Sequence, residues 1–316
     1  MENPAVTEAL LVPLDGSPLA DHAIPYAAAI AAPDARIVLF RVLAAEGGIE
    51  EVLDRFGTRA EVAQAGETAA RAALARSAAL LGERQGVELA TASGSPADAI
   101  LAAISTQGVG GVVIASHGRG AVGRWMFGSI ADRVAQASPA PVLIVRPETP
   151  DAPPAPVSLR RLLVPLDGSE TAMQALPVAA GLARAHGWPL HLLTAIDVSS
   201  MTPMAVPGPA MPISGELYEQ VYNEVEAAAQ QSLDDAAARL KGEGLAATTG
   251  VRVGPPNVAI TEAIQEGDLV VLCSHGRSGV QRWLLGSVAE QLVRFAPAPI
   301  MIVPVAGRQQ TVQAAR

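Results

Sequence analysis

The chain has 316 residues, of which 50% are hydrophobic and 17% are charged, with a formal net charge of −9. The apolar content excludes an intrinsically disordered chain, and the acidic balance argues against binding to nucleic-acid phosphates. Long uncharged runs that could span a membrane are absent from the sequence, and MENPAVTEAL at the start lacks the parts of a secretion signal. A single cysteine cannot form an internal disulfide. We therefore expect a cytoplasmic protein without nucleic-acid or membrane partners.

Two sequence motifs occur twice. LLVPLDGS at residues 10–17 recurs at 162–169, and ASHGRGAVGRWMFGSIADRVAQASPAPVLIV at 115–145 is matched by CSHGRSGVQRWLLGSVAEQLVRFAPAPIMIV at 273–303. The segment ETPDAPPAPVS between the copies is rich in proline, which favours an extended connection. The repeat predicts a first domain over residues 1–147, a linker over 148–158, a second domain over 159–306 and a tail over 307–316.

Within the first copy, predicted strands alternate with predicted helices. Apolar runs predict strands at residues 10–14, 36–43, 87–94, 111–116 and 141–147, and helices are predicted at 19–32, 58–85, from 96 and from 128. Ser17 before Pro18 is typical of a helix N-cap followed by proline at the first helical position. This alternation predicts two tandem doubly wound α/β domains, each with a five-stranded parallel sheet covered by helices on both faces.

Ligands of such sheets bind at the carboxyl ends of the strands, and both repeated motifs begin there. In each copy a Ser-His-Gly sequence is followed by nine residues and then by Gly-Ser. Glycine lets a backbone approach phosphate closely, and a helix N-terminus adds positive potential and amide donors. The spacing therefore indicates phosphate binding by Gly118, Gly128 and Ser129 in the first copy and by Gly276, Gly286 and Ser287 in the second. Arg119 and Arg124 in the first copy, and Arg277 and Arg282 in the second, would supply cations beside these loops.

Each motif also has a purely structural interpretation, which competes with ligand binding. Ser287 with Glu290 fits a helix capping box, and Ser129 with Asp132 is a near relative of one. Asp15 and Asp167 close the first strand of each copy, where a carboxylate accepts a hydrogen bond from a ribose hydroxyl or a base amine. The alternative is an Asp-Gly turn ahead of a helix, and the aspartates alone favour that turn.

These residues together resemble the universal stress protein family, over nearly the whole chain, as a tandem pair. The resemblance is carried by the opening strand that ends in Asp, by S-H-G-R, by the W-[ML]-[FL]-G-S run and by the closing A-P-[AV]-P strand. It implies a sheet order of 3-2-1-4-5 in each domain and ATP, alone or with Mg²⁺, in a cleft of each. The family's first motif glycine is replaced by Ala115 and Cys273.

Carried onto this sequence, the resemblance implies two sets of nucleotide-binding residues. We expect no metal ligands, because His117 and His275 lack Cys, His or carboxylate partners at ligand spacing. The first set is Asp15, Val42, Ala115, His117, Gly118, Arg119, Gly128 and Ser129. The second set is Asp167, Ala195, Cys273, His275, Gly276, Arg277, Gly286 and Ser287. Cys273 has a second interpretation as a redox sensor, although a lone cysteine ending an apolar strand favours an inert buried residue.

Three functions remain open. The first is a stress-response regulator controlled by adenine nucleotide, the second is an interaction scaffold without ligand, and the third is a slow ATPase, which ranks last because no carboxylate lies inside the phosphate motif. The apolar final strands predict pairing of the two domains and a homodimer of chains. The long segment 197–220, rich in proline and methionine, predicts a flap near the second cleft.

Overall fold

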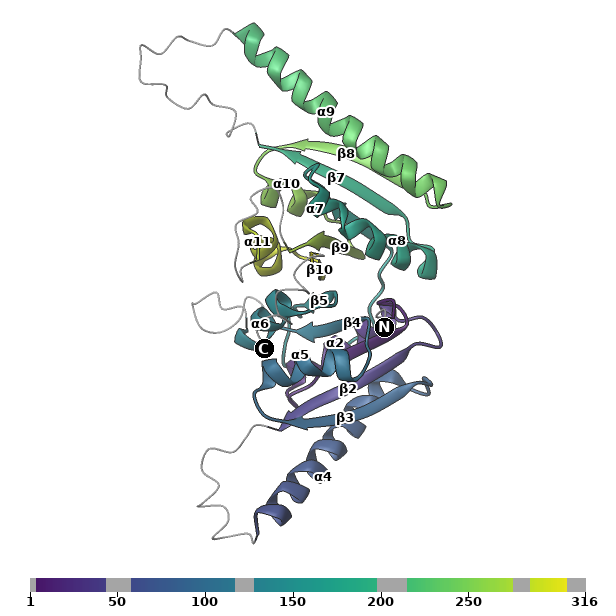
Figure 1. Ribbon diagram of the computed structural model, residues 1–316, viewed down its shortest axis with the longest axis vertical. Helices are drawn as coiled ribbons and strands as arrows, with labels where there is room; N and C mark the ends of the chain where they lie inside the picture. The colour runs from purple at the N-terminus through teal and green to yellow at the C-terminus, as the bar shows by residue number, and fades with distance from the viewer. Residues whose placement is uncertain (1–3, 44–57, 117–127, 198–214, 275–284, 306–316) are drawn as a thin grey trace, which may run out of the picture. The chain divides into compact units, whose positions relative to one another are not determined.

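The computed structural model describes residues 4–43, 58–116, 128–197, 215–274 and 285–305 (Figure 1). The chain forms two compact units, with the change between Leu159 and Arg160, and the second unit runs to Val305. We describe each unit by itself. None of the helices in these ranges is both long and apolar enough to cross a lipid bilayer.

Unit 1 contains five strands with helices between them. Its strands are β1 (Ala9–Pro13), β2 (Arg36–Leu43), β3 (Val87–Ser93), β4 (Gly111–Ala115) and β5 (Val142–Val145). Its helices are α1 (Pro18–Asp21), α2 (Ala23–Ile30), α4 (Arg59–Ala78), the short 3-10 helix η1 (Ala79–Leu81), α5 (Pro96–Thr106) and α6 (Ser129–Ala137).

The strands of unit 1 lie in the order β3-β2-β1-β4-β5, and all neighbours are parallel. Helix α2 packs near η1 at the end of α4, whereas α5 packs against α6, so the connections cover both faces of the sheet. The predicted fold class, a doubly wound α/β domain, is confirmed. Because helices cover both faces, β1 is apolar and buried along its whole length, as expected for a parallel sheet.

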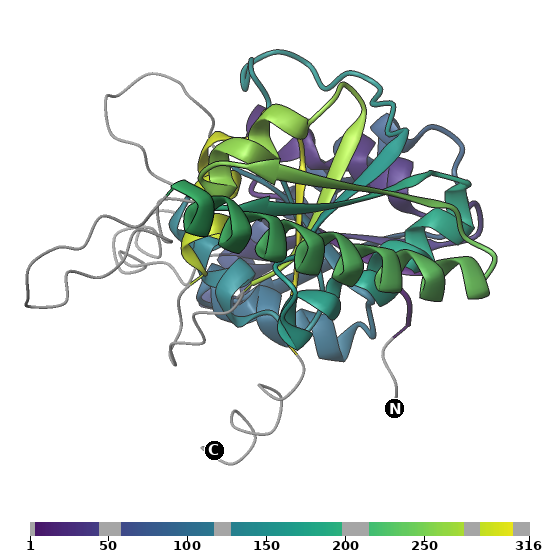
Figure 2. The same ribbon diagram turned by 90° about the horizontal axis from the view of Figure 1, so that it is seen from above.

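Unit 2 repeats this arrangement. Its strands are β6 (Arg161–Pro165), β7 (Leu190–Ile196), β8 (Ala247–Val253), β9 (Asp268–Cys273) and β10 (Ile300–Val303). Its helices are α7 (Glu170–Met173), α8 (Ala175–His186), α9 (Gly215–Gly242), α10 (Pro256–Ala263) and α11 (Ser287–Phe295). The order is β8-β7-β6-β9-β10, again parallel throughout. The long helix α9, green in Figure 2, runs along the strands of its sheet.

The helix predicted over residues 19–32 is instead two helices that meet at His22. Proline has no amide hydrogen, so Pro25 cannot donate to the carbonyl four residues earlier, and an uninterrupted helix would lose that hydrogen bond. The chain tightens at this point, where the His22 amide bonds to the Leu19 carbonyl at 3.1 Å. Unit 2 has the same break at Gln174, three residues before Pro177.

Unit 2 contains an ion pair between Arg161 and Asp268, which we call the brace. Asp268 is buried, with only 1% of its surface exposed. Its carboxylate accepts hydrogen bonds from Arg161 Nε at 2.7 Å and from Arg161 Nη2 at 2.6 Å. The amide of Gln265 donates to the same carboxylate at 2.8 Å. The equivalent position of β1 holds the alanine Ala9, so this ion pair ties the starts of β6 and β9 together in unit 2 alone among the described strands.

Candidate functional site

The candidate site lies at the carboxyl ends of the central strands. In unit 1 the strand order reverses at β1, which pairs with β2 on one side and with β4 on the other. Asp15 follows β1, Val42 lies near the end of β2, and Ala115 ends β4. In unit 2, Asp167, Ala195 and Cys273 take the same places on β6, β7 and β9. The topology thus brings these predicted residues to the edge where ligands of such sheets bind.

Asp15 organises the turn after β1. Its Oδ1 accepts a hydrogen bond from the Ser17 amide at 2.9 Å, and Ser17 Oγ caps α1 by accepting from the Ala20 amide at 3.2 Å. The predicted N-cap at Ser17 is therefore confirmed, and the turn that competed with the binding interpretation is present. Within the described ranges no group contacts Asp15 Oδ2 by a hydrogen bond, and the residue is exposed, so turn formation leaves one oxygen for a ligand.

Asp167 builds the same turn in unit 2. Its Oδ1 accepts from the Ser169 amide at 2.9 Å and from the Ser169 hydroxyl at 2.6 Å. Ser169 Oγ in turn accepts from the Ala172 amide at 3.1 Å and caps α7. Asp167 is less exposed than Asp15, so the two carboxylates share a role in the turn but differ in their access to solvent.

The end of β4 is tied to the start of α6. The buried Ser116 follows β4, and its Oγ accepts a hydrogen bond from the Gly128 amide at 3.2 Å. In unit 2 the Gly286 amide donates at 2.7 Å to the main-chain carbonyl of Ser274, which follows β9. Each bond holds the start of the following helix at the carboxyl edge of the sheet.

The capping interpretation of Ser129 and Ser287 is wrong. Gly128 and Gly286 are the N-caps, with ψ of 129° and 151°, so each serine is already the first helical residue. Asp132 accepts instead from Gln136 at 2.7 Å, and Glu290 pairs with Arg294 at 2.7 Å. These acidic side chains interact along their own helices, so neither closes a capping box.

Among the described residues, the first turns of α6 and α11 therefore contain amide donors that have no acceptor. In the part of the chain that the structure describes, the amides of Ser129, Ile130 and Ala131 have no hydrogen-bond acceptor, and the same holds for residues 287–289. Ser129 and Ser287 are exposed. Unsatisfied amides at a helix start carry partial positive charge and bind anions. Both units therefore present donors suited to phosphate oxygens.

The two replacements of the family's glycine lie at the strand ends. Ala115 is partly exposed, whereas Cys273 is buried with its Sγ 3.9 Å from the Ala172 carbonyl. Burial, together with the nearby charge of Asp167, raises the pKa of the Cys273 thiol to about 12. The thiol therefore stays protonated at neutral pH, which favours the inert interpretation over a redox sensor.

Sequence reasoning missed two residues at this edge. Ser116 could have been found because the serine recurs as Ser274 at the same place before each His-Gly pair. Arg41, which precedes Val42, gave no such signal because Thr194 stands at its position in the second copy. The structure places the Arg41 guanidinium against Gly16 in the turn after β1.

Several predicted residues lie outside the described ranges. These are His117, Gly118, Arg119, Arg124, His275, Gly276, Arg277 and Arg282. Most of the predicted flap, residues 198–214, is also outside them. The proposed roles of these residues therefore stay predictions. Among the residues that are described, no group of three or more His, Cys, Asp or Glu side chains could hold a metal ion.

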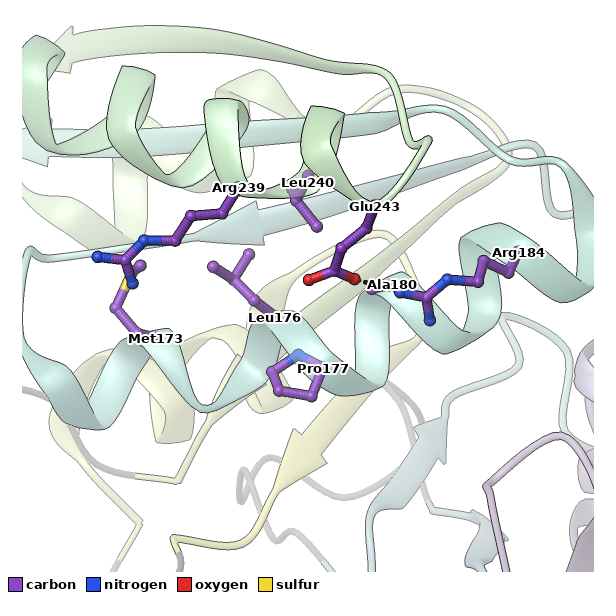
Figure 3. A pocket seen from close by; sticks show the side chains of 8 residues that line it. All are labelled: Met173, Leu176, Pro177, Ala180, Arg184, Arg239, Leu240 and Glu243. Carbon is purple, nitrogen blue, oxygen red and sulfur yellow. Dashed lines mark hydrogen bonds and ion pairs between the residues drawn. The ribbon is translucent and has the colours of Figure 1, made fainter.

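A groove of about 300 Å³ lies elsewhere in unit 2, between α8 and the last turns of α9 (Figure 3). Its apolar side chains include Leu176 and Leu240, and an ion pair between Arg184 and Glu243 crosses one end. The groove is lined by none of the residues predicted to bind nucleotide. We place the candidate site at the strand ends because both repeated motifs meet there.

A parallel sheet of this order, with helices between its strands, defines a doubly wound α/β fold. The family model of the universal stress protein family matches residues 7–146 and 158–304. The chain belongs to the universal stress protein family, and its two units are tandem domains of that family.

Individual relatives agree with this assignment. A universal stress protein of Mycolicibacterium smegmatis is 28% identical over 309 residues, which cover 96% of this chain and 99% of the relative. Universal stress protein MJ0531 of Methanocaldococcus jannaschii is 27% identical over 146 residues, covering 46% of this chain and 81% of the relative. The crystal structure of a universal stress protein from Archaeoglobus fulgidus superposes with a TM-score of 0.58 at 19% identity, covering 94% of this chain and 98% of that one.

Proposed function

We propose that each unit binds an adenine nucleotide, with ATP as the expected ligand, and that nucleotide occupancy regulates a cytoplasmic stress-response function. The observation that carries the proposal is the start of α6, where three amides have no acceptor in the described chain and Ser116 holds the helix against β4. The start of α11 has three such amides too, and there the main-chain carbonyl of Ser274 holds the helix against β9.

The donor set at each helix start fits a polyphosphate. A nine-residue helix directs its free amides and its positive end outward at Ser129, and the serine hydroxyl adds a donor. The nucleotide would supply the negative charge that satisfies these groups, and Mg²⁺ could accompany it. On the other side of the switch point, Asp15 Oδ2 is available to accept from a ribose hydroxyl, with Val42 beside it on β2.

A solved universal stress protein is described as a complex with cAMP. We base the proposal for this chain on its own residues, because that likeness covers 45% of the chain.

The described chemistry favours binding over hydrolysis. A hydrolase needs a side chain that orients or deprotonates water near the phosphates. The acids in the first turns of α6 and α11, Asp132 and Glu290, interact with Gln136 and Arg294 of their own helices. We therefore rank slow ATP hydrolysis below regulation by binding.

A ligand-free scaffold is the second candidate. Ala115 and Cys273 favour it, because each places a side chain where the family's ATP-binding pattern has glycine. The outermost strands β5 and β10 carry the apolar sequences VLIV and IMIV. We propose that these edges pair the two units within a chain. We further propose that two such chains form a homodimer, which sedimentation of the purified chain tests.

The proposal is tested on protein purified without added nucleotide. We expect heat denaturation to release an adenine nucleotide that chromatography identifies, and we expect added ATP with Mg²⁺ to stay intact during incubation. Rapid appearance of ADP would favour the ATPase. Empty protein that also gives no binding heat with ATP would favour the scaffold.

A further inference from the structure

The candidate sites of the two units differ at the residue that precedes Val42 or Ala195. In unit 1, Phe40 pairs with Pro13, and Arg41 is the next residue of β2. In unit 2, Leu193 pairs with Pro165, and Thr194 is the next residue of β7. The same place beside the central strand therefore holds a cation in one unit and a neutral side chain in the other.

Arg41 lies over the turn that carries Asp15. A methyl group added at Gly16 would come within 2.5 Å of Arg41 Nη1 and within 3.0 Å of Nη2, so the guanidinium covers this glycine. Gly16 has φ of +84°, which glycine adopts without strain. Within the described ranges Arg41 makes no hydrogen bond or ion pair, and it is partly buried. A guanidinium that has no partner among the described residues thus lies over the turn that carries the aspartate proposed to meet ribose.

In unit 2 the equivalent position holds a buried, neutral side chain. Thr194 is buried, and its Oγ1 donates to the Leu166 carbonyl at 2.9 Å, just before Asp167. An arginine is present one strand further out, because Arg252 of β8 pairs with Ala195 in the register and is exposed. In unit 2 an arginine is therefore present on β8, the strand beyond β7, while Thr194 takes the place against the turn that carries Asp167.

We propose that Arg41 makes the candidate site of unit 1 selective for adenine nucleotides that carry, besides the 5′-phosphate, a phosphate group at the 3′ position of the ribose. The inference deepens the proposed function and rests on it. Guanidinium groups bind phosphate through paired N–H donors, and an arginine near the ribose of a doubly wound fold accommodates a ribose phosphate. The candidate site of unit 2, with Thr194 in this place, does not make the distinction.

Two isomeric nucleotides test whether binding depends on where the phosphate groups are attached to the ribose. ADP and adenosine 3′,5′-bisphosphate each carry two phosphates, but only the second carries one at the 3′ position of the ribose. We expect calorimetry on the full chain to find one site that binds the bisphosphate at least about 10-fold more tightly than the other site does. Arg41→Thr should remove this difference while it changes ADP affinity less than about 2-fold.

Two further variants complete the experiment. Thr194→Arg should create a second selective site, and Arg76→Thr, which removes an exposed arginine from α4, should leave all affinities unchanged. The inference is overturned if Arg41→Thr weakens both isomers equally, or if it weakens neither while wild-type protein binds ATP. Absence of binding by ATP and by both isomers would overturn the proposed function as well. Thermal unfolding of each variant confirms that it is folded.

Discussion

The Ser116 hydroxyl and the Gly128 amide, twelve positions apart, are joined by a hydrogen bond of 3.2 Å. This bond fixes the start of α6 at the end of β4 through a side chain. In unit 2 the corresponding amide, Gly286, reaches the main-chain carbonyl of Ser274. The two domains therefore maintain the same helix position with different chemistry.

This difference predicts unequal effects of two matched substitutions. Ser116→Ala removes the acceptor of the Gly128 amide, so we expect unfolding of unit 1 to lose about 1 kcal/mol and nucleotide affinity there to fall. Ser274→Ala retains the carbonyl acceptor and should preserve the position of α11. Urea unfolding and ATP calorimetry measure both effects. Equal loss of ATP affinity in the two variants would show that the side-chain bond has no special role.

The brace in unit 2 predicts a large loss of stability. Asp268→Ala leaves the partly buried Arg161 without its carboxylate, and we expect about 3–5 kcal/mol less unfolding free energy. Asp98→Ala breaks the exposed pair with Arg133 and should cost less than about 1 kcal/mol. Denaturant titrations compare the two. Similar small losses in both variants would contradict the structural importance of the brace.

His191 predicts a dependence of stability on pH. Burial, and secondarily the charge of Arg161, lowers the pKa of His191 below its ordinary value. The unfolded chain therefore binds the proton more readily than the folded one, and the stability from neutral His191 is present above about pH 6.5 and is lost as the pH falls through the folded pKa. His191→Gln should reduce this acid loss in urea titrations between pH 7.5 and pH 5. If the stability of His191→Gln depends on pH as that of the wild type does, the acid loss is not caused by His191.

The thiol of Cys273 should react slowly in the folded protein. With its pKa raised to about 12, the thiolate is scarce at pH 7.5 and the sulfur is buried. We expect a thiol reagent to label Cys273 rapidly in denaturant and many-fold more slowly without it. Fast labelling of the native protein at neutral pH would restore the redox interpretation.

The sequence was sufficient for the fold class, because buried parallel strands such as β1 are continuous apolar runs that local composition reveals. It was not sufficient for the break at His22, where Pro25 interrupts an otherwise helical stretch, or for the helix start at Ser129. Whether a Gly-Ser pair places serine at the N-cap or inside the helix depends on ψ of the glycine. At Gly128 ψ is 129°, and the glycine amide bonds to Ser116, twelve positions away, a contact that the local sequence does not reveal. Arg41 was missed because its significance depends on contact with Gly16 across two strands.

The central claim is that the free starts of α6 and α11 hold the phosphates of a nucleotide. The most direct test is ATP calorimetry on a variant that combines Ser129→Asp with Ser287→Asp. Aspartate in the first turn stabilises a helix but repels phosphate. We predict that wild-type protein and a Ser95→Asp control at the start of α5 bind ATP, while the double variant stays folded and binds at least about 10-fold more weakly. Equal ATP affinity in the double variant and the wild type would contradict the claim.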